Sequence, residues 1–575
     1  MAATAEVVVL ERGPDVSYAN CGMPYYIGGV INDRANMLVQ TARTLKGRYG
    51  LDIRTRHEAV RIDRAERLVE VRDLTSGNTY TEPYDVLVLS PGASPVLPPI
   101  PGADGPKVLV LSNLVDMDAI ATAAKAAKKV TVIGAGFIGL ELVENLLHLG
   151  LEVTLIEVVD QVLPPLDWER TQPLLQELRL NRVDVRLGKT AAFIDERGVQ
   201  LKNGVRIASD FVCLCAGVRP NTDLAREAGL ELGPRSHIRV DDAMRTSDPS
   251  IYAVGDAVET ADLVTGEASG YPLAGPANRQ ARVAADQICG RASTYRGTQG
   301  TAIVRVFSLA AACTGLSEKR LKQAGLAYRR AFLHPMQHPR YYPNAQPIGF
   351  KILFSPEGKI YGAQAVGAEG ADVLIDTIAT AMRAGMTVQD LEQLELAYSP
   401  QWGGAKHGIN MIGYVASNIL NGDAEMVEPD EDVKGIQWLD VRAPGETECG
   451  MLPDALLIPL DELRARTDEL PRDRVIGAYC AVGLRGYIAC RMLKQMGFDA
   501  RNLDGGYRTW TWYHKPAADA LAPVACGQRA VHADGNGITN PPRMRRRRLR
   551  AVRAMRSPRL RWNRSTAPAC NVPGL

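Results

Sequence analysis

The chain has 575 residues and an ordinary hydrophobic content of 46%, a length that predicts about three to five domains. It contains no run of about 18 apolar residues, and residues 1–13 lack the basic start and apolar core of a signal peptide. A membrane span and secretion are therefore not expected. Ten cysteines without CxxC pairs or zinc-ligand spacing predict reduced thiols in the cytoplasm and no metal site.

The net charge of +2 is distributed unevenly. Residues 516–575 carry twelve arginines against two aspartates, a charge of +10, which leaves −8 on residues 1–515. Without apolar periodicity, this basic segment is predicted to be a disordered tail. Such a tail can contact nucleic acid. We favour a different explanation, that residues 527–575 lie outside the natural reading frame, and nucleic acid is not an expected partner.

The first predicted strand covers residues 6–11 (EVVVLE) and ends in Glu11. In a dinucleotide-binding unit the second strand ends in such a carboxylate, which bonds a ribose hydroxyl. An acid at the end of a strand is also common without that role. The strand and glycine loop that should precede Glu11 are not found in residues 1–5.

One cysteine lies in the stretch SYANCGMPYYIGG, residues 17–29. Cys21 follows a short predicted strand and precedes a Gly-Met-Pro turn, and a helix that opens there would direct its free N–H groups at the sulfur. This environment favours the thiolate, the form that attacks disulfides. A buried structural cysteine is the alternative. No second cysteine follows at CxxxxC spacing, so a partner sulfur must come from the substrate.

Residues 57–77 alternate like a hairpin that turns at Thr75-Ser76-Gly77. A buried strand at residues 86–89 breaks at Ser90-Pro91-Gly92. The proline-rich residues 95–101 are typical of an extended crossing between domains.

The sequence KVTVIGAGFIG, residues 129–139, is an intact dinucleotide-binding loop between a strand and a helix. Gly134 allows the tight turn, Gly136 lets the backbone approach a pyrophosphate, and Gly139 lets helix and strand pack closely. The next strand ends in Glu157, 23 residues after Gly134, where a carboxylate can bind the adenosine ribose. No arginine follows to hold a 2′-phosphate, so NADH is favoured over NADPH.

Two later strands belong with this unit. Residues 211–219 (FVCLCAGVR) run into Gly217, and we interpret both of their cysteines as core residues. Residues 246–256 (TSDPSIYAVGD) end in Asp256, whose carboxylate can accept a hydrogen bond from a sugar-like hydroxyl. A strand that ends in Gly-Asp is common without this role.

Two further units follow. The first combines predicted strands at residues 302–307, 349–354 and 360–366 with predicted helices at 373–384 and 388–395. An acidic linker is predicted at residues 421–434.

In the second unit, strands at residues 438–442 (WLDVR) and 475–480 (VIGAYC) precede the loop CAVGLRG. Cys480 opens this strand-to-helix loop, whose N–H groups can form an anion nest that favours a thiolate or a persulfide. A structural cysteine is the alternative.

These motifs together resemble the single-cysteine FAD- and pyridine-nucleotide-dependent disulfide reductases, in the coenzyme A-disulfide reductase form fused to a rhodanese domain. The reductase motifs are SYANCGMPYYIGG, VIGAGFIGLELVENL, DQVLPPLD and YAVGD, and the rhodanese motifs are LDVR, CxxGxR and GGYxxW. The resemblance implies an α/β fold with two Rossmann-like domains, an α+β dimerisation domain and an α/β rhodanese-like domain. The expected units are an FAD domain (1–125 and 246–300), an NAD(P) domain (126–245), a dimerisation domain (301–420), a rhodanese-like domain (430–515) and the tail (516–575).

The resemblance also implies roles for individual residues. FAD would be bound by Glu11, Arg12, Ser90, Gly92, Asp256 and Ala274. The pyridine nucleotide would be bound by Gly134, Gly136, Phe137, Ile138, Gly139, Glu141, Glu157 and Gly217. The remaining residues implied to act are Ser17 and Asn20 beside coenzyme A, Tyr342 and Tyr398 near Cys21 with one donated across a homodimer, and Arg485 as an anion holder beside Cys480. Tyrosines that merely pack are the alternative for Tyr342 and Tyr398.

The implied reaction passes hydride from NADH to FAD and then electrons to Cys21, which forms a mixed disulfide with coenzyme A. The expected substrate is coenzyme A disulfide, or a coenzyme A persulfide or polysulfide, with Cys480 transferring sulfur. Two other functions stay open: a peroxide or oxygen reductase with a Cys21 sulfenic acid, and a flavin-free sulfur carrier. Relatives begin with a strand and a glycine loop about two dozen residues earlier, so FAD affinity is expected to be poor.

Overall fold

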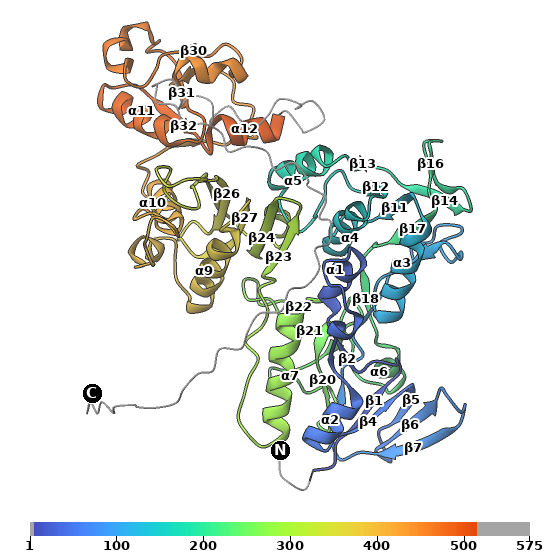
Figure 1. Ribbon diagram of the computed structural model, residues 1–575. Coiled ribbons are helices and arrows are strands. Elements are labelled where there is room, and N and C mark those ends of the chain that lie inside the picture. Colours follow the sequence, from blue (N-terminus) through green and yellow to red (C-terminus); the bar gives the residue numbers. More distant parts are fainter. Residues whose placement is uncertain (1–4, 515–575) are drawn as a thin grey trace, which may run out of the picture. The chain divides into compact units, whose positions relative to one another are not determined.

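The computed structural model describes residues 5–514, which form several sheets with their own helices (Figure 1). Near the N-terminus, β1 pairs in parallel with β4, β2 pairs with β3, and β5, β6 and β7 form an antiparallel sheet. The hairpin predicted around Thr75-Ser76-Gly77 is β6–β7. The bounds are β1 (Val8–Glu11), β2 (Ser17–Tyr18), α1 (Met23–Ile27), β3 (Leu38–Gln40), α2 (Ala42–Tyr49), β4 (Asp52–Thr55), β5 (His57–Asp63), β6 (Leu68–Asp73) and β7 (Thr79–Pro83).

Strands of this first part also pair with strands far along the chain. β8 (Leu87–Leu89) pairs in parallel with β20 (Ile251–Ala253), and β9 (Ala93–Pro95) pairs with β18 (Val218–Pro220). Because β8 and β20 are parallel, the residues just beyond their carboxyl ends meet at one edge, where open α/β sheets bind ligands. Nearby elements are α6 (Asp223–Glu227), β19 (Ile238–Arg239), β21 (Val258–Ala261), β22 (Ala268–Gly270) and α7 (Ala274–Ile288).

The intact glycine loop belongs to a five-stranded parallel sheet in the order β10-β17-β11-β12-β13. The central strands are buried, as expected where helices cover a parallel sheet. Cys213 in β17 is buried, as predicted. Cys215, just beyond this strand, is half-buried against the same core, and burial raises its pKa to about 12. The bounds are β10 (Val108–Leu109), α3 (Leu114–Ala126), β11 (Lys129–Ile133), α4 (Phe137–His148), β12 (Glu152–Ile156), α5 (Trp168–Leu180), β13 (Asp184–Arg186), β14 (Ala191–Asp195), β15 (Gly198–Leu201), β16 (Arg206–Ala208) and β17 (Phe211–Leu214).

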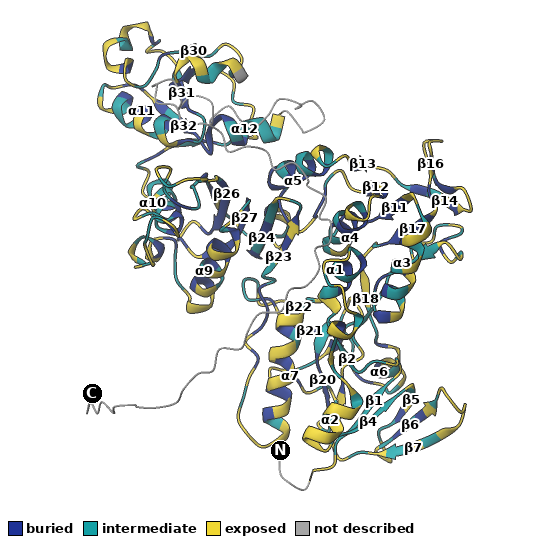
Figure 2. Ribbon diagram, viewed as in Figure 1, coloured by how far each residue is buried: buried dark blue, intermediate teal, exposed yellow. Residues whose placement is uncertain are grey.

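The next unit is an antiparallel sheet in the order β23-β24-β27-β26-β25. All residues of β26 and β27 are buried, which Figure 2 shows in dark blue. Residues 388–395, predicted as an α-helix, instead hold the short 3-10 helix η4 (Asp390–Gln393). The bounds are β23 (Ala302–Val306), β24 (Leu309–Gly315), α8 (Glu318–Gln323), β25 (Arg329–Leu333), β26 (Ile348–Phe354), β27 (Ile360–Gly367), α9 (Ala371–Ala384) and α10 (Gly408–Leu420).

The last unit is a parallel sheet in the order β28-β32-β31-β29-β30. Its outer strand β28 lies within residues 421–434, so part of the predicted linker pairs with β32. The bounds are β28 (Met426–Val427), β29 (Ile436–Asp440), β30 (Leu456–Leu457), β31 (Val475–Tyr479), α11 (Leu484–Gln495), β32 (Ala500–Leu503) and α12 (Gly506–His514). The other 3-10 helices are η1 (Asn20–Gly22), η2 (Arg34–Met37), η3 (Gly255–Ala257), η5 (Pro444–Cys449), η6 (Leu463–Ala465) and η7 (Thr467–Glu469).

The predicted α/β class is confirmed by these sheets and helices. Within residues 5–514, no helix has the length and apolarity that a membrane crossing requires. The predicted basic tail, residues 516–575, lies outside the described residues.

Candidate active site

Cys21 lies at the surface in η1, directly before α1. Met23 and Ile27 of α1 are buried in the core that α3 and α4 share, so this packing holds the turn that carries Cys21 in place. Ser17, in β2, and Asn20, in η1, precede Cys21 by four residues and one residue, and their contact with coenzyme A stays a prediction. The buried-cysteine alternative does not hold for Cys21, which is exposed.

A hydrogen bond connects the cysteine helix to the nucleotide-binding helix. The hydroxyl of Tyr25 donates to Oε1 of Glu141, on α4, at 3.2 Å. Burial, followed by the charge of Glu141, raises the pKa of Tyr25 to about 12. Burial also raises the pKa of Glu141, against the lowering effect of this hydrogen bond. Sequence reasoning missed Tyr25, although its position one helical turn after Cys21 was a usable signal.

The glycine loop has the geometry that a dinucleotide requires. Gly134 has a φ of 108°, and a side chain there would run into the carbonyl of Cys215. A side chain at Gly139 would run into the carbonyl of Gly134, which explains the close approach of helix and strand. At Gly136 a Cβ would meet nothing within 4 Å, so this side of the loop is open to a pyrophosphate.

Glu157, at the end of β12, is buried beside this loop. Its Oε2 accepts a hydrogen bond from the N–H of Ala135 at 2.7 Å, and its Oε1 accepts one from Val159 at 3.1 Å. Each carboxylate oxygen retains a second lone pair for a hydroxyl donor. A fixed negative charge at this position suits a ribose diol and opposes a 2′-phosphate, in line with the prediction of NADH.

The residues predicted for FAD include two carboxylates with different surroundings. Asp256 lies in η3, just beyond β20, where the preceding Gly255 N–H donates to Gln280 at 2.8 Å. Burial raises the pKa of Asp256, and no residue in the described range donates a hydrogen bond to it. A half-buried carboxylate without a donor fits a ligand hydroxyl. Glu11, at the end of β1, accepts from the N–H of Gly13 at 2.5 Å.

The other predicted nucleotide residues lie at turns and helix starts. Arg12 is 68% exposed and is 3.6 Å from Glu58, so its side chain is largely free to bind a ligand. The rest are Ser90 and Gly92 (φ 65°) beyond β8, Gly217 (φ 99°) before β18, Ala274 at the start of α7, and Phe137 and Ile138 at the start of α4. Their contacts with cofactors remain predictions.

Of the two tyrosines predicted to lie near Cys21, Tyr398 contacts Tyr341, the neighbour of Tyr342, and the role of Tyr342 and Tyr398 beside Cys21 stays a prediction. The hydroxyls of Tyr341 and Tyr398 are 3.3 Å apart, and both side chains are exposed. This hydrogen bond raises the pKa of Tyr341. Tyr342 instead packs edge-on against His338, with ring centroids 5.3 Å apart. Both tyrosines lie in a turn, in which the N–H of Tyr342 donates to the carbonyl of Pro339 at 3.0 Å, and the motif YYP alone does not say which ring faces Tyr398.

Cys480 follows β31, at the base of the loop that leads into α11. Its Sγ is buried and accepts a hydrogen bond from the N–H of Gly483 at 3.2 Å. Arg485 contacts both oxygens of Glu446 at 2.7 Å, which raises the pKa of Arg485 and lowers that of Glu446. The predicted loop is therefore present, Arg485 interacts with Cys480 as well as with Glu446, and its role as an anion holder stays a prediction.

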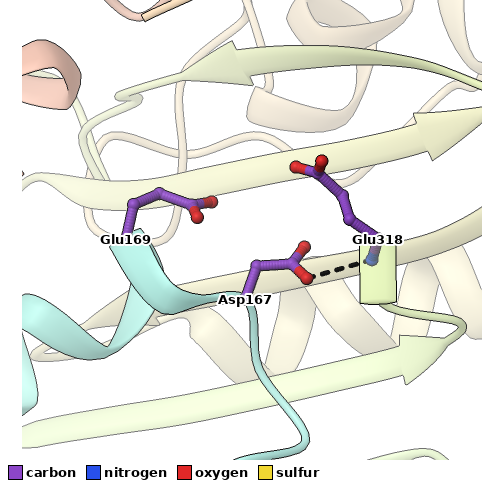
Figure 3. A group of neighbouring side chains, drawn as sticks. All are labelled: Asp167, Glu169 and Glu318. Atoms are coloured by element: carbon purple, nitrogen blue, oxygen red, sulfur yellow. Dashed lines mark hydrogen bonds between the residues drawn. The ribbon is translucent and has the colours of Figure 1, made fainter. Parts of the chain in front are cut away.

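Three buried carboxylates, those of Asp167, Glu169 and Glu318, converge near the start of α5 (Figure 3). Their oxygens lie within 4.8 Å of one another, a spacing that can hold a metal ion. The ammonium of Lys351 contacts all three carboxylates, Asp167 and Glu169 at 2.8 Å each. Burial would raise the pKa of Glu318, but Lys351 and Arg330 outweigh it and hold this pKa at about 2. The cation of this cluster is therefore a lysine.

The glycine loop, the exposed cysteine beside it and the second cysteine loop define a nucleotide-dependent oxidoreductase joined to a sulfurtransferase-like domain. Residues 1–281 match the pyridine nucleotide-disulphide oxidoreductase profile, residues 301–405 match its dimerisation domain, and residues 424–511 match the rhodanese-like domain. The chain is 34% identical to coenzyme A disulfide reductase of Staphylococcus aureus (strain JH9) over 416 residues, 72% of this chain and 94% of that protein. The chain belongs to the pyridine nucleotide-disulphide oxidoreductase family, and it is an enzyme.

Solved structures agree with this assignment. Reduced Bacillus anthracis CoADR-RHD is 44% identical with a TM-score of 0.87, covering 88% of this chain and 93% of that one. A NAD-dependent persulfide reductase from A. fulgidus is 37% identical with a TM-score of 0.84, covering 88% and 95%. A water-forming NADH oxidase from Lactobacillus brevis is 29% identical with a TM-score of 0.71, covering 73% and 94%. The predicted family, and FAD with a pyridine nucleotide as its cofactors, are confirmed.

Proposed function

We propose that the chain uses NADH to reduce coenzyme A disulfide or coenzyme A persulfide through Cys21, and that Cys480 transfers sulfur to or from the same carrier. The observation that carries this proposal is the solitary, exposed Cys21 in front of α1, joined to the nucleotide-binding helix by Tyr25 and Glu141. None of the cysteines in the described residues forms a disulfide with it. A single redox cysteine takes its partner sulfur from the substrate.

The chemistry at Cys21 is thiol–disulfide exchange. The Cys21 thiolate attacks one sulfur of coenzyme A disulfide, the S–S bond breaks, and one coenzyme A leaves as a thiolate. Cys21 is then bonded to the second coenzyme A, and two electrons restore the Cys21 thiolate and release that coenzyme A. When bound, NADH and FAD supply these electrons by hydride transfer. The fitting residues are the Gly134 loop and Glu157 for NADH, and Asp256 and Glu11 for FAD.

A homodimer would complete the site. The matched dimerisation domain supports this assembly, and the exposed hydroxyls of Tyr341 and Tyr398 would be available to the Cys21 region of a partner protomer. A tyrosine hydroxyl there can protonate the coenzyme A thiolate as it leaves. The predicted location of the enzyme is the cytoplasm, where thiols stay reduced.

Turnover by the purified full-length chain supplemented with FAD tests the proposal. NADH oxidation should depend on coenzyme A disulfide or persulfide, and Cys21→Ser should reduce it by at least about a thousandfold, because the attacking thiolate is lost. Cys289→Ser is the matched control, since Cys289 is also an exposed cysteine. Faster turnover with hydrogen peroxide or oxygen than with coenzyme A disulfide would assign a peroxidase or an oxidase instead.

A further inference from the structure

The LDVR motif, residues 439–442, ends in an arginine that is buried beside the helix η5. Arg442 is 2% exposed, and its guanidinium bonds both oxygens of Asp440, at 2.9 Å through Nε and 2.6 Å through Nη2. Its terminal nitrogens also donate to the carbonyl of Glu446 at 3.1 Å and to that of Gly450 at 2.8 Å. These two carbonyls lie on η5 and directly after it, so Arg442 fixes the backbone that carries the side chain of Glu446.

The carboxylate of Glu446 binds the arginine of the Cys480 loop, residues 480–486. Nη1 and Nη2 of Arg485 each donate to one of its oxygens at 2.7 Å. Oε2 of Glu446 also accepts a hydrogen bond from the N–H of Ala443, at the start of η5, at 3.0 Å. An arginine that binds a carboxylate with two parallel hydrogen bonds is held strongly and in one direction. Glu446 therefore determines where the charge of Arg485 lies and how far it is compensated.

The sulfur of Cys480 lies beside this ion pair. Cys480 is 1% exposed, and its Sγ accepts a hydrogen bond from the N–H of Gly483 at 3.2 Å. Arg485 interacts with Glu446 and also with Cys480, and both contacts raise the pKa of Arg485. The guanidinium is therefore a permanent cation near the sulfur, and the carboxylate of Glu446 cancels its charge. An ion pair of zero net charge attracts an anionic sulfur donor far less than a free guanidinium does.

We propose that Glu446 determines the donor specificity of the Cys480 loop: by pairing with Arg485, it favours organic persulfides over thiosulfate. This inference rests on the proposed function and names the donor class of the rhodanese-like domain. The reacting sulfur of thiosulfate is bonded directly to a sulfonate, whose charge must enter the loop with it. The reacting sulfur of coenzyme A persulfide is bonded to a sulfur on an uncharged pantetheine arm, and the phosphates lie at the other end of that arm.

The two donors differ in the group that leaves. The Cys480 thiolate attacks the outer sulfur of coenzyme A persulfide, the S–S bond breaks, and coenzyme A leaves as a thiolate that takes up a proton. With thiosulfate, the same attack breaks the S–S bond and releases sulfite, a dianion, near the carboxylate of Glu446. In both reactions Cys480 becomes a persulfide, and no net oxidation or reduction occurs. Because Arg485 is already paired, the developing charge of sulfite is not stabilised, and transfer from thiosulfate is slowed.

The test measures the second-order rate constant for persulfide formation on Cys480 in the full-length chain, by mass spectrometry of the alkylated peptide that contains this residue. Coenzyme A persulfide and thiosulfate are the two donors, and the ratio of their rate constants is compared between variants. Both rates depend equally on the folded fraction of a variant, so a substitution that merely impairs folding does not change the ratio. The unaltered chain should react faster with coenzyme A persulfide than with thiosulfate.

Glu446→Gln removes the charge that compensates Arg485, and it should shift the ratio toward thiosulfate about tenfold, the effect of one hydrogen bond to a charged group. Arg485→Gln leaves the carboxylate uncompensated and should shift the ratio in the opposite direction. Glu448→Gln is the matched control, because it removes the same charge from an exposed position on the same helix.

No shift in Glu446→Gln, an equal shift in Glu448→Gln, or shifts of the same sign in Glu446→Gln and Arg485→Gln would overturn this role of Glu446. An unaltered chain that reacts faster with thiosulfate would overturn it as well. These outcomes would leave sulfur transfer by Cys480 in place. Failure of the unaltered chain to take sulfur from either donor would refute the proposed sulfur transfer itself, and this inference with it.

Discussion

Replacement of Lys351 by methionine tests whether the lysine neutralises the three carboxylates in Figure 3. The ammonium is fully buried and lies 2.8 Å from both Asp167 and Glu169. Methionine fills similar space and removes the charge, which leaves uncompensated buried carboxylates. Breaking a buried ion pair in this way costs about 3–5 kcal/mol of unfolding free energy at neutral pH.

The pH dependence of the stability loss in Lys351→Met distinguishes the effect of the missing charge from an effect of altered packing. Without Lys351, the pKa values of the carboxylates rise in the folded protein, so the loss of stability is largest above these values and shrinks as pH falls and they take up protons. Denaturant unfolding followed by tryptophan fluorescence at pH 8 and pH 5.5 measures this difference. Lys359→Met, at an exposed position before β27, is the control. A loss below about 1 kcal/mol at pH 8, or a loss that is equal at both pH values, would refute the reasoning.

Three further outcomes are expected. Gly134→Ala should lower both NADH affinity and thermal stability, because Gly134 has a positive φ and a carbonyl beside it, whereas Gly136→Ala should lower NADH affinity alone. NADH titration and thermal unfolding distinguish the two variants, and equal losses of stability would contradict the loop geometry. Tyr25→Phe removes a hydrogen bond that lowers the pKa of Glu141, so any step that requires ionised Glu141 should shift to higher pH. The pH profile of the rate of NADH oxidation measures this shift, and an unchanged profile would exclude the coupling. Burial keeps His334 neutral by holding its pKa well below the ordinary 6.5. Its contribution to the free energy of unfolding is therefore fully present above pH 6.5 and falls by about 1.4 kcal/mol at pH 5.5. His334→Gln should abolish this part of the stability lost at acid pH, as measured by unfolding experiments.

The sequence alone identified the features that depend on local backbone chemistry. The glycines after β11 are required by a tight turn and a close helix–strand contact, and both requirements act within a few residues of the chain. The cysteines were recognisable for the same reason, since Cys21 precedes a short helix and Cys480 a strand-to-helix loop. These patterns also predicted the α/β class and the family.

Only the tertiary structure decided which side chains meet across large sequence separations. Tyr341 rather than Tyr342 faces Tyr398, because the packing of the segment before β26 sets its orientation. Glu446, 39 residues away, neutralises Arg485. The carboxylates around Lys351 come from the starts of two helices, α5 and α8, that are distant in the sequence. Charge pairing depends on distance in space, which local sequence patterns do not encode.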